Sequence, residues 1–208
     1  LAYELCKQHG LGNPQLDRLV HLTHLGDLFL EHDADFTLAC DYGSLVKNYG
    51  FWNLHNVIGG QLEALIDHPL LEVMRVRREI EDPIGFRLAL NEVTELSPTV
   101  GLVRPPVGST NLIVHRILNE GVTKYPVIVS LHRRGAGVFV VSFRSCNGEA
   151  LGVAQKFEGG GGHANAAGAT LPRLNDYDSA IQFLRTRLAP PAPATKSGFT
   201  TMAEAFTE

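Results

Sequence analysis

The stretch that decides the fold spans residues 125–171 and reads YPVIVSLHRRGAGVFVVSFRSCNGEALGVAQKFEGGGGHANAAGATL. Residues 125–131 and 138–143 are runs of β-branched and aromatic side chains, each of strand length. Two glycines lie between them in residues 133–137, and a short glycine-containing connection of this kind joins antiparallel strands. This half of the stretch therefore predicts a β-hairpin.

The second half of the stretch adds helices and a further strand. Residues 150–157 are typical of a short helix, and residues 169–171 of a strand. Downstream, residues 178–188 place three apolar side chains on one helical face after a possible aspartate or asparagine cap, which predicts a closing helix. Together these elements predict an α/β fold, α+β-like, in which helices flank a mixed β-sheet.

The upstream residues 1–95 have a helical period instead. Asn13 and Pro14 supply a helix cap and a first-turn proline, and apolar residues follow at a spacing of three to four. Residues 72–82 mix arginines with acids and are typical of a solvated, ion-paired helix end. Residues 35–40 fit either a short strand or the start of a helix, and the sequence leaves both open. The segment as a whole is predicted to be mainly helical.

Charge divides the chain into two units. Of the 208 residues, 44% are hydrophobic, which allows one large domain or two small ones. Residues 1–95 carry 7 bases and 15 acids, whereas residues 124–173 carry 6 bases and 2 acids. Because such asymmetry indicates units with different roles, we place a boundary near residue 96. A helical segment at 1–95 then precedes a domain at 96–188 and a Pro/Ala linker with a disordered tail at 189–208.

The overall composition excludes several classes of protein. A net charge of −4 is not that of a polycation, so any anion site must be local. Three cysteines are too few and too far apart for a disulfide framework or a Cys-x2-Cys zinc site, which favours the reducing cytoplasm. No apolar run approaches the roughly 20 residues of a membrane span, and no signal peptide is visible. Because the chain lacks an initiator methionine, we expect it to be part of a longer protein.

Four consecutive glycines, residues 159–162, are not explained by helix or strand propensity. Such a run lets bare backbone N–H groups approach an anion, and a protonated His163 at its rim can donate to a phosphate oxygen. The alternative is a flexible linker, but linkers pair glycine with serine and are not followed by the small residues found here. The substrate-binding candidates of this loop are Gly159, Gly160, Gly161, Gly162 and His163.

Ser142 and Arg144 end the strand just upstream of this loop. Residues two apart in a strand share a face, so the hydroxyl and the guanidinium fork can both address one phosphate. An edge-strand arginine in solvent would explain Arg144 alone, but its proximity to the glycine run favours an anion site. We identify no catalytic and no metal-binding residue in this chain.

Residues 126–171, with their Val-Ser-Phe-Arg-Ser strand end and Gly-Gly-Gly-Gly-His-Ala-Asn-Ala-Ala-Gly motif, resemble the DHH-associated C-terminal domain of the DHH phosphoesterase superfamily. That superfamily includes nano-RNases that also act on phosphoadenosine phosphate, exopolyphosphatase-related proteins and single-strand exonucleases. The resemblance implies a mixed sheet flanked by helices over roughly residues 96–188. It also implies that Arg144, the glycine loop, His163 and Asn165 bind the substrate phosphate opposite a metal site.

Members of the superfamily carry their metals on an N-terminal domain whose motifs are Asp-x-Asp, a further aspartate and Asp-His-His. No Asp-His-His occurs in this sequence, and Asp33-Ala34-Asp35 lacks the apolar strand that would aim such a motif. We therefore expect the catalytic domain to be missing, together with the two Mn²⁺ or Mg²⁺ ions that it would hold. No cofactor is expected in this chain, and residues 1–95 are then the tail of the missing domain and a connector.

Two other features leave alternatives open. Asp17, His21 and His24 lie near one helical face at a spacing that a metal could use, although a polar helix face explains them as well. Residues 41–53 gather the single tryptophan with other aromatics, which fits either a base-stacking surface or a packed connector between lobes.

These features predict the substrate-binding C-terminal part of a DHH-type phosphoesterase, which binds the phosphate of a short oligonucleotide or nucleotide. No membrane partner is expected, and both a monomer and a homodimer are open. The alternative is a non-catalytic nucleic-acid-binding module, because a related domain forms the C-terminal domain of alanyl-tRNA synthetases. The sequence does not choose among nano-RNA, phosphoadenosine phosphate, a cyclic dinucleotide and polyphosphate as the substrate.

Overall fold

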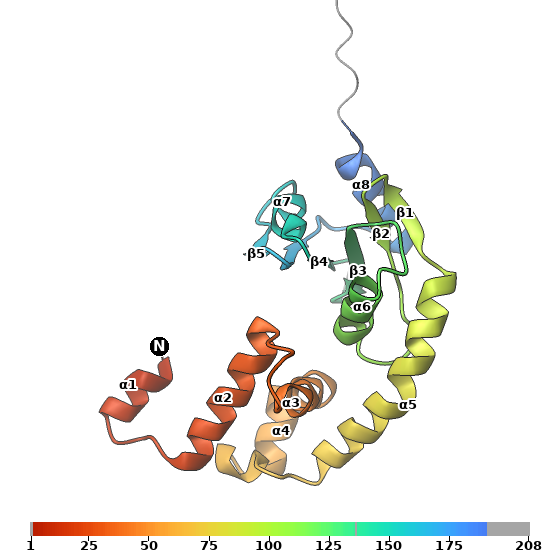
Figure 1. Cartoon of the computed structure of the whole chain (residues 1–208). Coiled ribbons are helices and arrows are strands. Elements are labelled where there is room, and N and C mark those ends of the chain that lie inside the picture. Colours follow the sequence, from red (N-terminus) through yellow and green to blue (C-terminus); the bar gives the residue numbers. More distant parts are fainter. Residues whose placement is uncertain (1, 136, 191–208) are drawn as a thin grey trace, which may run out of the picture.

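The structure is a computed structural model that describes residues 2–135 and 137–190. Figure 1 shows an N-terminal helical unit and a C-terminal unit that contains a sheet, joined by one long helix. The predicted linker and tail at 189–208 lie, from residue 191 onward, outside the described residues. None of the described helices is long and apolar enough to cross a membrane.

The helical unit is built as the sequence predicts. The Asn13 side chain accepts a hydrogen bond from the Leu16 amide at 2.8 Å, which confirms the predicted cap. Residues 35–40, which fitted a strand or a helix, lead into a helix. The elements of the unit are α1 (Ala2–Gln8), α2 (Pro14–Leu28), α3 (Phe36–Tyr49), α4 (Phe51–Val57) and the 3₁₀ turn η1 (Leu62–Leu65).

Helix α5 (Leu70–Asn91) joins the two units (Figure 1). The prediction that residues 72–82 end a helix is wrong, because α5 continues through Pro83 to Asn91. A proline inside a helix costs about 3 kcal/mol, and the buried residues Phe86 and Ala89, which follow it, offset this cost by packing into the second unit.

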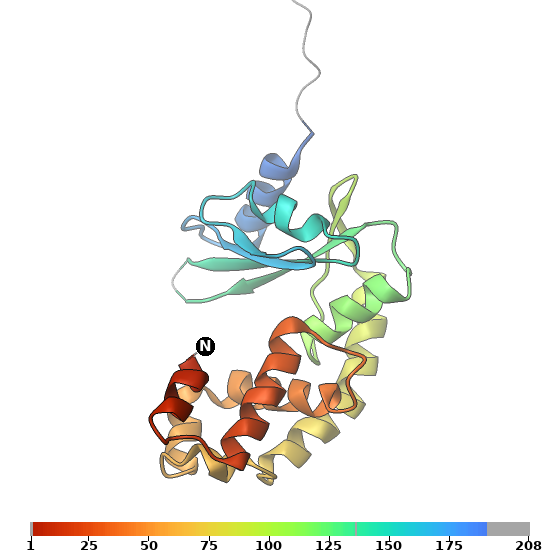
Figure 2. The same ribbon diagram turned by 60° about the vertical axis from the view of Figure 1, so that its left-hand side comes forward.

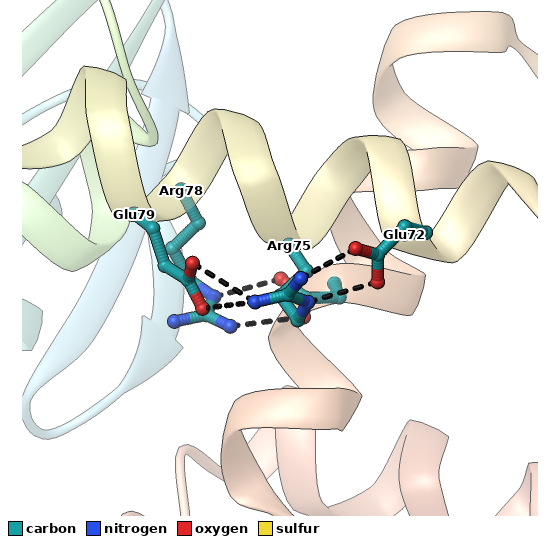
Figure 3. A network of polar contacts seen from close by, with 5 residues as sticks. Glu72, Arg75, Arg78 and Glu79 are labelled. Atoms are coloured by element: carbon teal, nitrogen blue, oxygen red, sulfur yellow. Dashed lines mark hydrogen bonds and ion pairs between the residues drawn. The ribbon is translucent and has the colours of Figure 1, made fainter.

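The predicted ion pairs of this segment are present (Figure 3). Arg75 lies between Glu72 and Glu79 and forms ion pairs with both carboxylates. Arg78 instead donates to the buried Asp41 of α3 at 2.8 Å. The first set is exposed and contributes little to stability, whereas the second ties α5 to α3.

The C-terminal unit is a mixed sheet with helices, as predicted. Its strand order is β1-β2-β3-β4-β6-β5, and β2 pairs with β3 in parallel whereas the other described pairs are antiparallel. The predicted hairpin is the β3/β4 pair. The elements are β1 (Thr94–Ser97), β2 (Val100–Leu102), α6 (Thr110–Asn119), β3 (Val127–Arg133), β4 (Phe139–Ser145), α7 (Glu149–Ala154), β5 (Gly161–His163), β6 (Ala166–Thr170) and α8 (Tyr177–Leu188).

The two faces of the sheet have different neighbours. Alternate residues of β4, such as Phe139 and Phe143, are buried against α7 and α8 and form the main core. On the other face, α6 packs over Ile128 together with the end of α5. In Figure 2, α7 and α8 lie above the sheet and helices α2 and α3 below it, so the remainder of this second face is turned toward the helical unit.

Candidate functional site

Three neighbouring strands bring the predicted arginine and histidine into one row. Arg144 on β4 pairs with Ala166 on β6, and Ala166 pairs with His163 on β5. Directly paired residues point to the same face of a sheet. Because neighbouring strands are about 4.8 Å apart, the backbones of Arg144 and His163 lie about 10 Å apart, with a single methyl group between them.

The next row on the same face consists of Ser142, Gly168 and Gly161, which pair across the same strands. The middle position of this row has no side chain, and the middle of the first row has only a methyl group. The two rows therefore form a shallow surface with a serine and an arginine along one side and a histidine along the other. We call these six positions the floor.

The four glycines have different roles in the structure. A Cβ atom on Gly160 would lie 1.9 Å from the Ala154 carbonyl oxygen, and one on Gly162 would lie 2.6 Å from Cα of Ala167. Gly159 and Gly162 have positive φ angles of 66° and 139°. The fold therefore requires these three glycines. Gly161 differs from them, because it is exposed, has open space around its Cβ position and does not have a positive φ. Of the four, it is the one glycine that the fold does not require, and the close approach of an anion to the backbone stays a prediction for this residue.

Asn165 has a structural role in the turn between β5 and β6. Its Oδ1 accepts a hydrogen bond from the Gly148 amide at 2.7 Å and a second one from the Ser145 hydroxyl at 3.4 Å. These bonds fix the turn against the end of β4 and the start of α7. A contact of Asn165 with substrate stays a prediction, confined to its side-chain nitrogen.

Arg144 is half-buried and has no ion pair among the described residues. Its guanidinium donates one hydrogen bond within this part of the chain, from Nη1 to the Phe143 carbonyl oxygen at 3.3 Å. Burial lowers the pKa of the guanidinium, because a low-dielectric environment disfavours its charged form. A bound anion would offset the cost of burying this charge and would use the remaining N–H donors.

Arg144 and His163 open onto a cavity of about 1310 Å³ between the two units. Its walls come from α2 and α3 of the helical unit and, in the C-terminal unit, from α6 and the first row of the floor, which consists of Arg144, Ala166 and His163. Most of the wall is apolar. Its polar side chains include Lys47, Asn111, His115, Asn119, Arg144 and His163.

The loop after α2 closes one end of this cavity against α6. The ring centroids of Phe29 and His115 are 4.3 Å apart. Glu31 Oε2 lies 3.5 Å from His115 Nδ1 and accepts a hydrogen bond from Asn119 Nδ2 at 3.3 Å. Phe29 adopts a left-handed conformation with φ 56°, a strain of roughly 1–2 kcal/mol that these contacts hold in place.

Two histidines of the C-terminal unit are half-buried: His115 lies on the cavity wall and His132 lies on β3. Burial lowers the pKa of His115; Glu31 opposes the shift and Arg144 adds to it. Burial also lowers the pKa of His132, and the nearby Lys47 adds to that shift. Both imidazoles therefore stay neutral in the folded chain at pH values where a free histidine is already protonated.

We expect the thermal stability of the chain to fall as the pH drops below about 6.5, the ordinary pKa of histidine. The unfolded chain then binds protons that the folded chain resists, so protons favour unfolding. His115→Gln should make the fall between roughly pH 7 and 5 shallower in a melting series. His24→Gln, on an exposed side of α2, is the control and should keep the wild-type slope. Equal slopes for wild type and His115→Gln would contradict the assignment.

The helical face with Asp17, His21 and His24 is not assembled for a metal. Asp17 pairs with Lys7 at 2.6 Å. His21 instead lies near the loop before α3, where ligand atoms of His21, Asp33 and Asp35 are all within 4.8 Å of one another.

This second group does not fit the two-ion centre of the superfamily either. Both carboxylate oxygens of Asp35 accept hydrogen bonds from the Arg18 guanidinium, one of them at 2.7 Å. The same pair lowers the pKa of Asp35. A guanidinium on this carboxylate competes with a metal cation, so no catalytic step is assigned to this group.

The aromatic segment 41–53 is divided between the two predicted roles. Tyr42 and Tyr49 pack in the helical core, and the Tyr42 hydroxyl donates to the Leu65 carbonyl oxygen at 2.9 Å. Phe51 and Trp52 are 60% and 72% exposed. The packed connector is therefore formed by the tyrosines, and only Phe51 and Trp52 are available for stacking.

Comparison with known families agrees with this architecture. Residues 108–189 match the family model of the DHHA1 domain, the DHH-associated C-terminal domain of the DHH phosphoesterase superfamily. This segment, which runs from just before α6 to just after α8, is a DHHA1 domain, and the resemblance noted in the sequence is confirmed. No curated protein matches the chain.

The sequence analysis did not identify four of the polar residues of the cavity wall, Lys47, Asn111, His115 and Asn119. Asn111 and His115 are four residues apart on α6, on a different side from its buried Ile113, and this spacing could have marked a polar helix face. No local sequence pattern marks Lys47 as a residue of the site. It lies on the cavity wall only because the helical unit packs beneath the sheet.

Proposed function

We propose that this chain binds the phosphate of a short nucleotide or oligonucleotide on the floor, as the substrate-binding part of a DHH-type phosphoesterase. The observation that carries the proposal is Arg144, a half-buried cation without a counter-ion among the described residues. In this proposal its fork donates two hydrogen bonds to phosphate. A protonated His163 donates a third from the other side of the floor, and the Ser142 hydroxyl lies in the adjacent row.

The cavity favours a nucleotide over polyphosphate. At about 1310 Å³ it is larger than a phosphate needs, and its largely apolar wall suits a nucleoside. A polyphosphate chain would require cations along its length, but Lys47 and Arg144 are the only lysine and arginine on the described wall. Nano-RNA and phosphoadenosine phosphate are therefore the substrates that we favour.

Hydrolysis belongs, in this proposal, to a longer protein. Two Mn²⁺ or Mg²⁺ ions on an Asp-x-Asp and Asp-His-His domain would supply the activated water. The residues of this chain would hold and orient the substrate phosphate. We place the protein in the cytoplasm, since Cys6, Cys40 and Cys146 are unpaired thiols.

Incubation of this chain with Mn²⁺ and labelled RNA tests the proposal against a general nucleic-acid-binding module. We expect binding of a dinucleotide without release of mononucleotide. Because the cavity takes a short substrate, the affinity for an RNA of about 20 nucleotides, counted per RNA molecule, should be no higher than the affinity for the dinucleotide. Affinity that rises steeply with RNA length would instead support the module, and metal-dependent release by a pure preparation would place a catalytic site in this chain.

A further inference from the structure

A polar cluster lies at the end of the cavity next to Arg144. Its members are Glu31 from the loop after α2, Asn119 from the end of α6, and Cys146, which follows Arg144 by two residues. The Asn119 side chain joins the other two. Its Nδ2 donates to Glu31 Oε2 at 3.3 Å, and its Oδ1 accepts a hydrogen bond from Cys146 Sγ at 3.2 Å. Since all four residues line the cavity, these bonds hold a carboxylate beside the strand end that carries Arg144.

His115 also relates Glu31 to Arg144. Glu31 Oε2 lies 3.5 Å from His115 Nδ1. The charge of Arg144 contributes to the lowered pKa of the same imidazole, and an effect of this kind weakens with distance. Because both charged groups act on one histidine, an anion bound at Arg144 has the Glu31 carboxylate as a neighbour.

Glu31 uses one carboxylate oxygen within the fold and leaves the other open. Oε2 accepts the bond from Asn119, whereas Oε1 has no hydrogen bond to any described residue. The side chain of Glu31 is 38% exposed. Phe29 holds the loop in place, since its ring packs against Phe36 and His115 at centroid distances of 4.8 and 4.3 Å. Oε1 is therefore a fixed acceptor on the cavity wall that is open to a ligand.

We propose that Glu31 selects ribonucleotides over deoxyribonucleotides, because its Oε1 accepts a hydrogen bond from the ribose 2′-hydroxyl. The inference rests on the proposed function, since it requires the 5′-phosphate of the ligand to lie at Arg144. A carboxylate is an acceptor only, so Glu31 cannot bind the phosphate itself, whose oxygens are also acceptors. The sugar is bonded directly to that phosphate, and its hydroxyls are the nearest donors of the ligand.

The 2′-hydroxyl fits this acceptor better than the other donors of a nucleotide. In an oligonucleotide the 3′ oxygen belongs to the next phosphodiester, so the 2′-hydroxyl is the sugar hydroxyl that stays free to donate. The donors of the base lie beyond the sugar, where the largely apolar part of the wall suits the base. Because the 2′-hydroxyl is the group that distinguishes RNA from DNA, this contact gives the site a preference for RNA.

The charge of Glu31 strengthens this selection. A carboxylate near a bound phosphate repels it, so a deoxyribonucleotide meets the repulsion and gains no hydrogen bond in return. For a ribonucleotide, the charge-assisted hydrogen bond offsets the repulsion. The quantity that reports on Glu31 is therefore the ratio of the affinities for the two ligands, because a general change in phosphate binding leaves this ratio unchanged.

NMR titrations of the chain with adenosine monophosphate and with 2′-deoxyadenosine monophosphate test the proposal. In the wild type, we expect the ribonucleotide to bind about 5- to 20-fold more tightly, the lower part of the range for a hydrogen bond to a charged group, since Glu31 is partly exposed. Glu31→Ala should reduce this ratio to about one. Glu120→Ala is the matched control. It removes the same charge from a residue that pairs with Arg116 at 2.6 Å and is not part of the cavity wall, so the ratio should stay at the wild-type value.

The outcomes separate this inference from the proposed function. Equal affinities for the two nucleotides in the wild type, together with weaker binding of both by Arg144→Ala, would overturn the selection by Glu31 and leave the phosphate site in place. A change of both affinities by the same factor in Glu31→Ala would also overturn it, because a residue that only holds the loop does not distinguish the sugars. If neither nucleotide binds, or if binding does not depend on Arg144, the proposed function fails and this inference fails with it.

Discussion

Gly160→Ala is expected to destabilise the DHHA1 domain by about 2–4 kcal/mol, the largest loss of stability that we predict for a single methyl group. The added Cβ would lie 1.9 Å from the Ala154 carbonyl oxygen and 3.1 Å from that of Phe157. Both atoms are backbone, so no rotamer change relieves the overlap. The end of α7 or strand β5 must move, and this movement disturbs Phe157 in the main core. Urea unfolding followed by circular dichroism measures the effect.

The neighbouring glycine is the control. Gly161 has no atom within 4 Å of its Cβ position, lies on the surface and does not have a positive φ. Gly161→Ala should therefore change the free energy of unfolding by no more than about 0.5 kcal/mol. Similar losses in the free energy of unfolding for Gly160→Ala and Gly161→Ala would mean that the two positions accept a side chain equally well or equally badly. That result would contradict the packing described here.

Arg144→Ala is expected to weaken binding of adenosine monophosphate about 10- to 150-fold, equivalent to about 1.5–3 kcal/mol for charge-assisted hydrogen bonds. Folding should be nearly unaffected, because Arg144 forms no ion pair among the described residues. Arg144→Lys should bind with intermediate affinity, since lysine keeps the charge but cannot form the bidentate hydrogen bonds of a guanidinium. Calorimetry gives the affinities and a melting curve the stability.

The control for this experiment is Arg134→Ala. Arg134 is exposed in the turn between β3 and β4, away from the cavity wall. If general attraction to the basic sheet accounted for binding, its loss would weaken affinity as much as the loss of Arg144. Near-wild-type binding by Arg134→Ala is the expected result.

Most of the fold could be predicted because its signals are local. The β3/β4 hairpin follows from two β-branched runs around a glycine turn, and the start of α2 follows from the Asn13 cap. The continuation of α5 through Pro83 could not be predicted this way. It depends on the packing of Phe86 and Ala89 against a distant part of the chain, which local propensity does not contain.

The floor could be predicted only in part. Ser142 and Arg144 share a face by strand alternation alone, as the sequence indicates. The alignment of Arg144 with His163 depends on β6 lying between β4 and β5, and a strand order of this kind is set by tertiary pairing. The separate roles of Gly160 and Gly161 could not be predicted from the sequence either, because they depend on tertiary packing: Gly160 packs on the end of α7 and Gly161 does not.

The most direct test of the proposed site is an NMR titration of the ¹⁵N-labelled chain with adenosine monophosphate. The account predicts that the amide and side-chain signals of Arg144, Gly161 and His163 shift together and saturate together, with a dissociation constant from high micromolar to about millimolar. Shifts centred on His21, Asp33 and Asp35 while the floor stays silent would contradict it and would move the binding site to the helical unit.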